Sequence, residues 1–301
     1  MTVPSVPSGD DLLILLAVSR SGRFTTAGHA LGLNHTTVAR RISSLEDQLG
    51  GRVLTRDGAG WALTALGSRA VAAAEAVESA LAPLHDADDA GITGLIRLSA
   101  TDGFSGFVAA PAMAALRREH PGIALEIVTG TRQASAQRVG ADLEVIVGRP
   151  TVRRAEAVHL ADYVLGLYAT RDFLGRVGTP ETLADITGAP LVYFIESMLQ
   201  VDVLDDARRE IPQMFDAVTS TNVYVHVDAT RAGAGFGLLP CFLADQHDDL
   251  VRLLPGEFAR RLPYWLVARP DAFRQPAIAA FLDALRVRLT DVRPNLLGIR
   301  A

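Results

Sequence analysis

The stretch FTTAGHALGLNHTTVARRIS, residues 24–43, carries the local pattern that decides the fold of the N-terminal part of the chain. Ala27 and Leu31 are spaced so that both face inward from one helix. Gly32 follows, and glycine tolerates the positive φ angle that a tight turn needs. Leu33 is expected to pack in that turn. The stretch therefore predicts a short helix, a tight turn and the start of another helix.

The second of these helices, predicted over residues 36–49, is expected to read DNA. Asn34 is suited to cap it by accepting hydrogen bonds from free amides. In a helix-turn-helix, residues near the N-terminus of the recognition helix reach base edges in the major groove. Arginines one turn later are well placed for phosphates or a guanine. The contacts predicted here are Asn34, His35, Thr36, Thr37, Arg40 and Arg41.

The charge distribution is compatible with a DNA-binding surface at this end. The 301-residue chain has a formal net charge of −5, so it is not a basic protein that coats nucleic acid. Between Asp11 and Glu46, however, there is no acidic residue, whereas four arginines lie inside this gap. Because the local field at the contact surface governs binding, the overall negative charge does not exclude DNA as a partner.

A small β-wing is expected after the recognition helix. The chain turns at Gly50–Gly51 into Val53–Leu54, and a loop over residues 57–60 leads to Trp61–Leu63. Turn residues between two short apolar segments favour a hairpin. Arg56 would then reach the DNA backbone.

Residues 66–90 are predicted to form a linker helix that pairs with another subunit. Its apolar residues recur in steps of four and three, which is a heptad seam. Pro83 disfavours the last turn, because proline lacks an amide donor and clashes with the preceding turn. A helix that lies on its own core remains the alternative. The seam consists of Leu66, Ala70, Ala73, Val77, Ala80 and Leu84.

From residue 91 to residue 292 strands and helices alternate, which favours α/β layers with mainly parallel sheets. The candidate strands are Leu95–Ala100, Ala124–Val128, Leu143–Val147, Val164–Tyr168, Leu191–Phe194, Asp216–Thr219, Gly235–Leu239, Val251–Leu253 and Tyr264–Val267, and the intervening helices are Val108–Glu119, Val201–Arg209, Tyr224–Ala232 and Pro276–Leu289.

The N-terminal stretch resembles the DNA-binding domain of LysR-type transcriptional regulators. The residues that match in register are Phe24–Thr25, Ala27, Leu31, Arg40–Glu46, Leu49–Gly50, Arg56 and Leu63–Gly67. The resemblance adds Thr25 and Thr64 to the candidate DNA contacts. Gly28 departs from the family's usual alanine and is expected to weaken its helix by roughly 0.5–1 kcal/mol. Ala39 replaces a common serine, which affects the DNA sequence that is read.

The resemblance continues to about Leu289. Gly94–Leu98, Glu119–Ile123, Ala141–Val145 and Arg231–Pro240 are similar to segments of the family's effector-binding domain. It implies an α/β fold with an all-α winged helix-turn-helix N-terminal domain, a long linker helix and a two-lobed, periplasmic-binding-protein-like effector domain. The corresponding bounds are residues 8–65, 66–90 and 91–292.

A small-molecule effector is expected in the cleft between the two lobes, since ligands of open α/β sheets bind beyond the carboxyl ends of strands, against helix N-termini. Asp102 has two interpretations. It caps a helix, which we favour, or it faces the cleft and favours a cationic or amide-bearing effector over an anion. The candidate effector-binding residues are Thr101, Asp102, Thr129, Ser220, Thr221 and Asn222.

Several other signals are weak. The glycines of residues 233–237 precede a strand, whereas a dinucleotide-binding fingerprint follows one into a helix. The seven histidines are scattered, His226 is expected to be a hydrogen-bonded structural residue, and Cys241 a buried small hydrophobe. We therefore expect no catalytic residue, no metal and no cofactor.

The sequence thus predicts a cytoplasmic regulator without a membrane segment. It would form a homodimer or homotetramer on a pseudo-palindromic promoter site in double-stranded DNA. Two alternatives are weighed against it. One is a solute-binding protein whose N-terminal helices make protein contacts, and the other is a small-molecule enzyme built on the α/β region.

Overall fold

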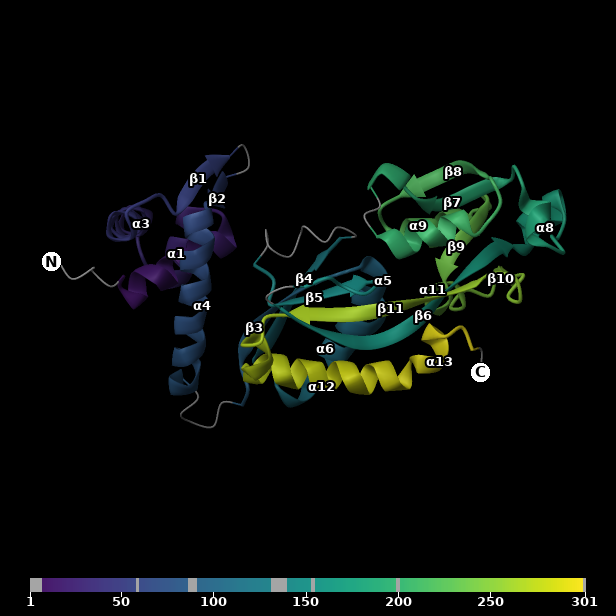
Figure 1. The fold of residues 1–301 in the computed structure, drawn as a ribbon. Coiled ribbons are helices and arrows are strands. Elements are labelled where there is room, and N and C mark those ends of the chain that lie inside the picture. The colour runs from purple at the N-terminus through teal and green to yellow at the C-terminus, as the bar shows by residue number, and fades with distance from the viewer. Residues whose placement is uncertain are drawn as a thin grey trace. The chain divides into compact units, whose positions relative to one another are not determined.

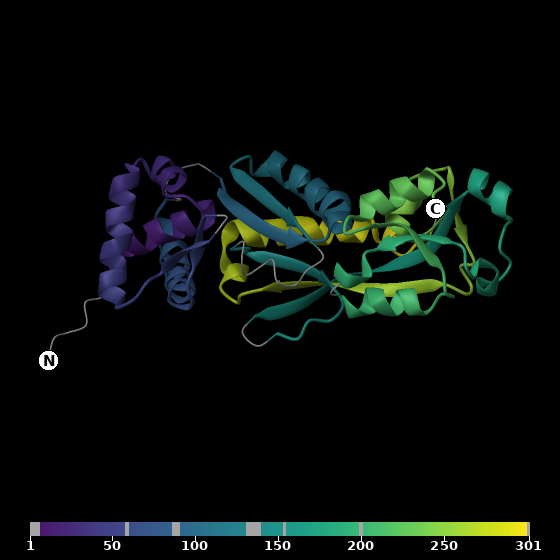
Figure 2. The same cartoon turned by 90° about the horizontal axis from the view of Figure 1, so that it is seen from above.

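The computed structural model describes residues 7–57, 60–85, 91–130, 140–152, 155–198 and 201–299. Residue contacts divide the chain into two compact units, residues 1–90 and 91–301. Figures 1 and 2 show the elements of each unit from two directions.

The first unit is a winged helix-turn-helix, as expected. Helices α1, α2 and α3 end at Gly22, Gly32 and Gly50, whose φ angles of 67°, 64° and 70° are those that glycine adopts most easily. The wing strands pair antiparallel, from Leu54 opposite Leu63. The elements are α1 (Gly9–Ser21), α2 (Phe24–Leu31), α3 (His35–Leu49), β1 (Leu54–Asp57), β2 (Gly60–Leu63) and α4 (Ala65–His85).

The core of this unit lies where α1, α3 and α4 meet. An apolar stripe on α3, formed by Val38, Ile42 and Leu45 at helical spacing, is buried in this core. Ala27 is buried as expected, whereas Leu31 is 40% exposed, so the expectation that Leu31 faces inward is wrong. Leu33, which was expected to pack in the turn, is 37% exposed. The backbone at Gly28, rather than leucine side chains, makes the close contact between α2 and the turn.

Helix α4 packs against its own unit over its first half. Ala70 is buried in the core, and Leu66 and Val77 pack against it, whereas Ala73 is exposed. The alternative of a helix that lies on a core thus accounts for most of the described part of the heptad seam. The side chains of Ala80 and Leu84 lie outside the described residues, and pairing with another subunit stays a prediction.

The second unit is built on one curled, mixed sheet in the order β4-β3-β5-β11-β6-β9-β7-β8, with β10 beside β6. The strands are β3 (Gly94–Ala100), β4 (Ile123–Thr129), β5 (Leu143–Val147), β6 (Glu156–Thr170), β7 (Pro190–Phe194), β8 (Phe215–Ser220), β9 (Phe236–Pro240), β10 (Leu250–Leu253) and β11 (Ala259–Ala268).

The expectation of mainly parallel pairing is wrong. Strands β3, β4 and β5 pair in parallel at one end, and β7, β8 and β9 pair in parallel at the other. The long strands β6 and β11 run side by side in opposite directions and connect the two ends, so every pair that involves them is antiparallel. The sequence suggested only the apolar parts of these strands, and their length and direction were not visible there.

Helices cover the sheet at both ends. They are α5 (Asp102–Phe104), a π-helical turn (Ser105–Ala109), α6 (Ala110–Glu119), α8 (Arg171–Val177), α9 (Asp202–Arg209), α10 (Val223–Arg231), α11 (Cys241–Ala244), α12 (Pro276–Asp291) and α13 (Arg293–Leu296), and short 3-10 turns lie at Leu183–Ile186, Glu196–Met198 and Ala272–Arg274. Among the described residues, none of the helices has the length and apolar character needed to cross a membrane.

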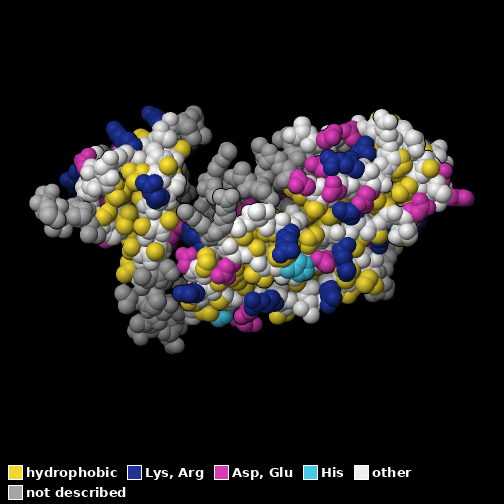
Figure 3. Space-filling model, viewed as in Figure 1, with side chains coloured by type: hydrophobic (Ala, Val, Ile, Leu, Met, Phe, Trp, Pro, Cys, Tyr) yellow, Lys and Arg dark blue, Asp and Glu magenta, His cyan; other side chains and the backbone are white. Residues whose placement is uncertain are grey.

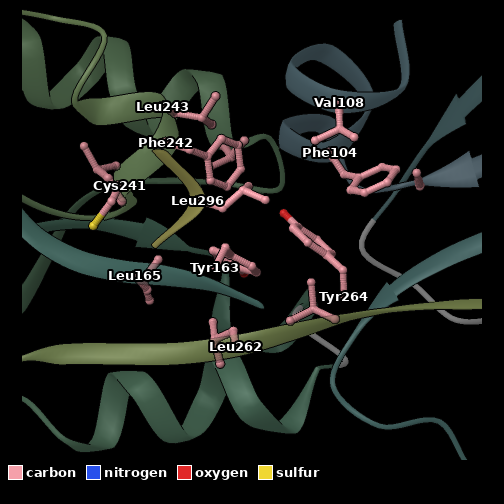
Figure 4. Packing of buried hydrophobic residues seen from close by; sticks show 14 of the residues in the cluster. Phe104, Val108, Tyr163, Leu165, Cys241, Phe242, Leu243, Leu262, Tyr264 and Leu296 are labelled. Atoms are coloured by element: carbon pink, nitrogen blue, oxygen red, sulfur yellow. The ribbon is translucent and has the colours of Figure 1, made fainter. Parts of the chain in front are cut away.

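The middle of the second unit is an aromatic core (Figure 4). Tyr163 of β6 stacks on Tyr264 of β11 with ring centroids 4.6 Å apart. Phe104 meets Tyr264 edge-on at 5.0 Å, and Phe242 meets Tyr163 at 5.7 Å. These rings come from α5, β6, β11 and α11, so they join both ends of the sheet into one core.

Candidate functional sites

The start of α3 has the geometry of a capped, exposed recognition helix. The Asn34 side chain accepts a hydrogen bond from the Thr36 amide at 3.1 Å, which confirms the predicted cap. The Thr36 hydroxyl donates to the same oxygen at 3.1 Å. His35, Thr36 and Arg40 are exposed and Thr37 is half-buried, while Val38 faces the core.

Several cations of the first unit remain available to an anionic partner. Arg40 on α3 and Arg56 on the wing are exposed, and neither has an ion pair within the described part of the chain. Arg23, directly before α2, is equally exposed and unpaired among these residues; it was not among the predicted contacts, although it lies in the acid-free gap. Figure 3 shows basic side chains gathered over α3 and the wing.

Two predicted DNA contacts are occupied within the unit. Arg41 pairs with Asp11 and, at 3.6 Å, with Asp10, so its guanidinium ties α3 to α1. The hydrogen bond with Asp11 raises the pKa of Arg41. The Thr64 hydroxyl donates to the Arg52 carbonyl at 2.6 Å and accepts from the Gly67 amide at 3.0 Å. These side chains serve packing and the start of α4.

Glu46 connects the recognition helix to the wing, a role that the sequence did not reveal. Its carboxylate is 8% exposed and accepts hydrogen bonds from the amides of Val53 at 2.9 Å and Leu54 at 3.4 Å. It also pairs with Arg52 at 3.0 Å. The available signal was an acidic residue directly beside the apolar stripe of α3.

Gly28 has a role in packing that the sequence did not reveal. The sequence suggested a glycine that merely weakens α2. In the structure this residue is buried, and a Cβ atom there would lie 2.6 Å from the Leu33 carbonyl oxygen. The tight approach between α2 and the turn therefore needs a residue without a side chain. Gly28 is a packing residue of the helix-turn-helix.

In the second unit, Thr101 directly follows β3, and Thr129 is the last residue of the neighbouring strand β4. Ala100 lies opposite Thr129 in the parallel pair of β3 and β4, and the Gly130 amide donates to the Ala100 carbonyl at 3.1 Å. The Thr101 hydroxyl oxygen is buried and interacts with the Tyr264 hydroxyl, whereas Thr129 is exposed.

The other predicted residues lie at the start of α10. Asn222 caps this helix by accepting from the Tyr224 amide at 2.9 Å, and the Ser220 hydroxyl accepts from the Asn222 amide at 3.1 Å. Thr221 is exposed. Below them, the ring of His226 is fully buried, and its Nε2 bonds to the Ser220 carbonyl at 3.0 Å, as expected of a structural histidine.

The starts of α5 and α10 meet across the unit. A Cβ atom at Gly103 would lie 3.5 Å from Val223, and one at Gly106 only 2.1 Å from the Tyr224 hydroxyl. Two glycines thus allow α10 to approach the first helical turns after β3. Tyr224 was missed by the sequence analysis, because nothing in its local pattern distinguishes it from a surface tyrosine.

Asp102 does not cap the helix, so the favoured interpretation of this residue is wrong. Thr101 occupies the cap position, no side chain donates or accepts a capping bond there, and Asp102 is the first helical residue. Asp102 has no ion pair among the described residues. Burial, and then the negative charge of Asp102, raise the pKa of Tyr224. The carboxylate is therefore near the contact between α5 and α10.

Two discounted signals have ordinary structural explanations. The glycines of residues 233–237 lead into β9 and not into a helix. Cys241 is fully buried, and burial raises the pKa of its thiol, which disfavours the reactive thiolate.

Comparison with known proteins gives the same two-part division. Residues 10–68 match the family model described as bacterial regulatory helix-turn-helix protein, lysR family, and residues 89–290 match the LysR substrate binding domain. The probable regulator LrrA of Synechococcus elongatus is 26% identical over 94% of this chain and 97% of its own length. DmlR of Escherichia coli is 26% identical, with 64% of each protein aligned. A full-length OxyR variant from Pseudomonas aeruginosa has the same fold, with a TM-score of 0.73 at 17% identity over 94% of this chain and 99% of that one.

Proposed function

Because this chain belongs to the LysR family of bacterial transcriptional regulators, we propose that it contacts promoter DNA through the exposed start of α3 and through the wing. The chain is a regulator with a helix-turn-helix DNA-binding domain and an effector-binding domain, and members of this family are not enzymes. The observation that carries the proposal is an exposed, acid-free helix start followed by the unpaired Arg40.

The proposed contacts divide into two kinds. His35, Thr36 and Thr37 would read base edges, since they begin the recognition helix. Arg40, Arg56 and Thr25 would bind the backbone and fix the register of the protein on DNA. Asn34, Arg41 and Thr64 have side chains engaged within the unit, so we assign them to holding this surface in shape.

For the second unit we propose an effector that carries a cationic or amide N–H group. The unpaired Asp102 carboxylate supports this class, because it would attract such a group and repel an anion. The buried Thr101 hydroxyl and the exposed Thr129 and Thr221 would supply further hydrogen bonds. Ser220 and Asn222 would act by positioning α10.

We further propose the domain bounds 8–65, 66–90 and 91–292, with α4 as a dimerisation helix. Two copies related by two-fold symmetry would fit a pseudo-palindromic site whose half-sites lie one helical turn, ~10 base pairs, apart. The cytoplasm is the proposed location, because promoter DNA is found there.

A gel-shift titration with the DNA upstream of the gene for this chain, at several salt concentrations, tests the interface. Arg40→Ala should weaken binding and lower the slope of log affinity against log salt by about one contact, because one phosphate contact is lost. Arg117→Ala, which removes an exposed arginine of α6, is the matched control. An unchanged isotherm for both Arg40→Ala and Thr37→Ala would contradict the assignment of this helix.

A further inference from the structure

A cavity of the effector-binding unit lies between the long strands β6 and β11 and the C-terminal helices α12 and α13. It has a volume of about 370 Å³ and is lined from β6, β11, α12 and α13. None of the residues proposed for effector binding lines it. Its size falls within the range of about 300–1,000 Å³ that is typical of small-molecule sites.

The floor of this cavity is apolar. Leu266 of β11, Leu282 and Leu289 of α12 and Phe273 of the preceding turn contribute to it. Leu266 is 1% exposed and belongs to the main core. Val158 of β6, which is 42% exposed, and the half-buried Phe273 and Leu297 also line the cavity, so a ligand there would cover their apolar surface, and burial of apolar surface favours binding.

The rim of the cavity is basic. Arg261, Arg286 and Arg293 line it together with His159, and Asp162 is the one acidic residue of the described lining. In Figure 3, basic side chains gather around a histidine on the face that carries β6 and α12.

The ion pairs leave this rim with an excess of positive charge. Asp162 pairs with Arg261 at 3.4 Å, and its carboxylate also contacts the His159 ring at 2.8 Å. Arg286 pairs with Asp283 at 2.6 Å. Arg293, the first residue of α13, is exposed and has no ion pair within the described residues.

From this combination we propose that the cavity binds a small amphipathic carboxylate with an aromatic or branched aliphatic body. The body would lie on the leucine and phenylalanine floor. The carboxylate would accept hydrogen bonds from Arg293 and Arg261, because guanidinium groups recognise carboxylates in a two-bond geometry. This ligand is an anion, whereas the ligand proposed for the Asp102 contact carries a cationic or amide N–H group. The unit would therefore carry two sites of different chemistry.

Calorimetric titration of the full chain with 3-phenylpropionate and hexanoate tests the site. The uncharged 3-phenylpropanamide is the ligand control. The acids should bind, and the amide should bind about tenfold more weakly, since a charge-assisted bond is replaced by a neutral one. If neither acid binds at millimolar concentration, or if the amide binds as well as the acid, the proposal is wrong.

Matched variants locate the binding. Arg293→Gln should weaken 3-phenylpropionate binding about tenfold, because it removes the unpaired cation without breaking an ion pair. Arg274→Gln changes an exposed arginine outside the lining and should leave the affinity unchanged. Thr290→Trp places a large side chain at the rim and should abolish binding, while a thermal unfolding curve verifies that the variant is folded. If Thr101→Val abolishes binding and Arg293→Gln does not, the acid binds between α5 and α10 instead, which overturns the proposal.

Discussion

The two units present their candidate contacts at helix starts, but they build them in different ways. At α3 the proposed DNA contacts come from one short stretch of chain, are mostly exposed and include an unpaired cation. At α5 and α10 the proposed effector contacts come from segments more than 100 residues apart and surround one unpaired carboxylate. The first site is local and basic, whereas the second depends on tertiary contacts and carries a negative charge.

This difference predicts how a single substitution should affect each site. A surface that lies on one helix can lose a contact and keep its shape, because the core below is formed by other residues. A site between two helices changes when either helix moves. The residues that hold each site in place, Glu46 in the first unit and His226 in the second, should therefore have larger effects on stability than the contacts themselves.

Glu46→Ala should give the largest loss of stability. It tests whether the first unit depends only on local patterns or also on this contact between α3 and the wing. Two backbone amides would lose their acceptor, so the free energy of unfolding of this unit should fall by about 2–4 kcal/mol. Urea unfolding followed by circular dichroism measures this loss. Asp47→Ala, an exposed neighbour, is the control. Equal stability of the two variants would show that the wing holds without Glu46.

His226 predicts a pH dependence of the second unit. Burial lowers its pKa to about 4, and the hydrogen bond to Ser220 opposes this only partly. The unfolded chain therefore binds the proton first. The stabilisation is complete above about pH 6.5 and is lost as the pH falls toward 4, by about 3 kcal/mol.

The measurement is the free energy of unfolding of the full chain between pH 7 and pH 4. His226→Gln keeps a donor for the Ser220 carbonyl but cannot titrate, so its stability should vary less over this range. The same pH dependence in both proteins would assign the effect to other groups and weaken the comparison.

Gly28→Ala tests the tight approach in the helix-turn-helix. Strain from the added methyl group should cost about 1–3 kcal/mol, which exceeds the gain of up to about 1 kcal/mol from the helix propensity of alanine. Gly175→Ala on α8 is the matched control, because a Cβ atom there meets nothing within 4 Å. Thermal unfolding should show a lower midpoint for the first variant and an unchanged or higher one for the second. A stabilised Gly28→Ala would mean that the turn shifts freely.

Arg41→Ala and Arg40→Ala give the smallest and most specific contrast. The Asp11 side chain is only 7% exposed whereas Arg41 is 35% exposed, so loss of their pair should cost about 1–2 kcal/mol of stability and leave the salt dependence of DNA binding unchanged. Arg40→Ala should instead leave the stability unchanged and lower the salt dependence of DNA binding. Unfolding curves and salt-dependent gel shifts on both variants check this. A reduced salt slope for Arg41→Ala would return this residue to the DNA interface.

Much of the first unit could be predicted from the sequence. The stripe of Val38, Ile42 and Leu45, the Asn34 cap and the glycine turns are local patterns, and the structure has them all. The errors there concern contacts between elements. Gly28 was interpreted only as a residue that weakens α2, because the sequence does not show that the Leu33 carbonyl lies against it. The sequence also does not show that Asp11 lies beside Arg41, whose assignment to DNA stays a prediction.

In the second unit the sequence located strands and helices but not their directions. It proposed Thr101, Asp102 and Ser220 as effector contacts from their positions after strands, and this assignment stays a prediction. It did not find Tyr224, whose place opposite Gly106 arises from packing between distant segments. The cavity beside Arg293 is another such case, since its lining comes from four elements.

The sequence by itself determined the helix-turn-helix, its capped recognition helix and the order of elements that follows. These depend on periodicity, capping and turn chemistry, which act over a few residues. Only the tertiary structure decided which polar side chains remain free. Arg41, Thr64 and Asn222 are engaged within their units, whereas Arg40, Asp102 and Arg293 have no ion pair among the described residues. A charged or polar group is available to a ligand only when no neighbour in the fold has already satisfied it, and that neighbour is set by the packing of distant segments.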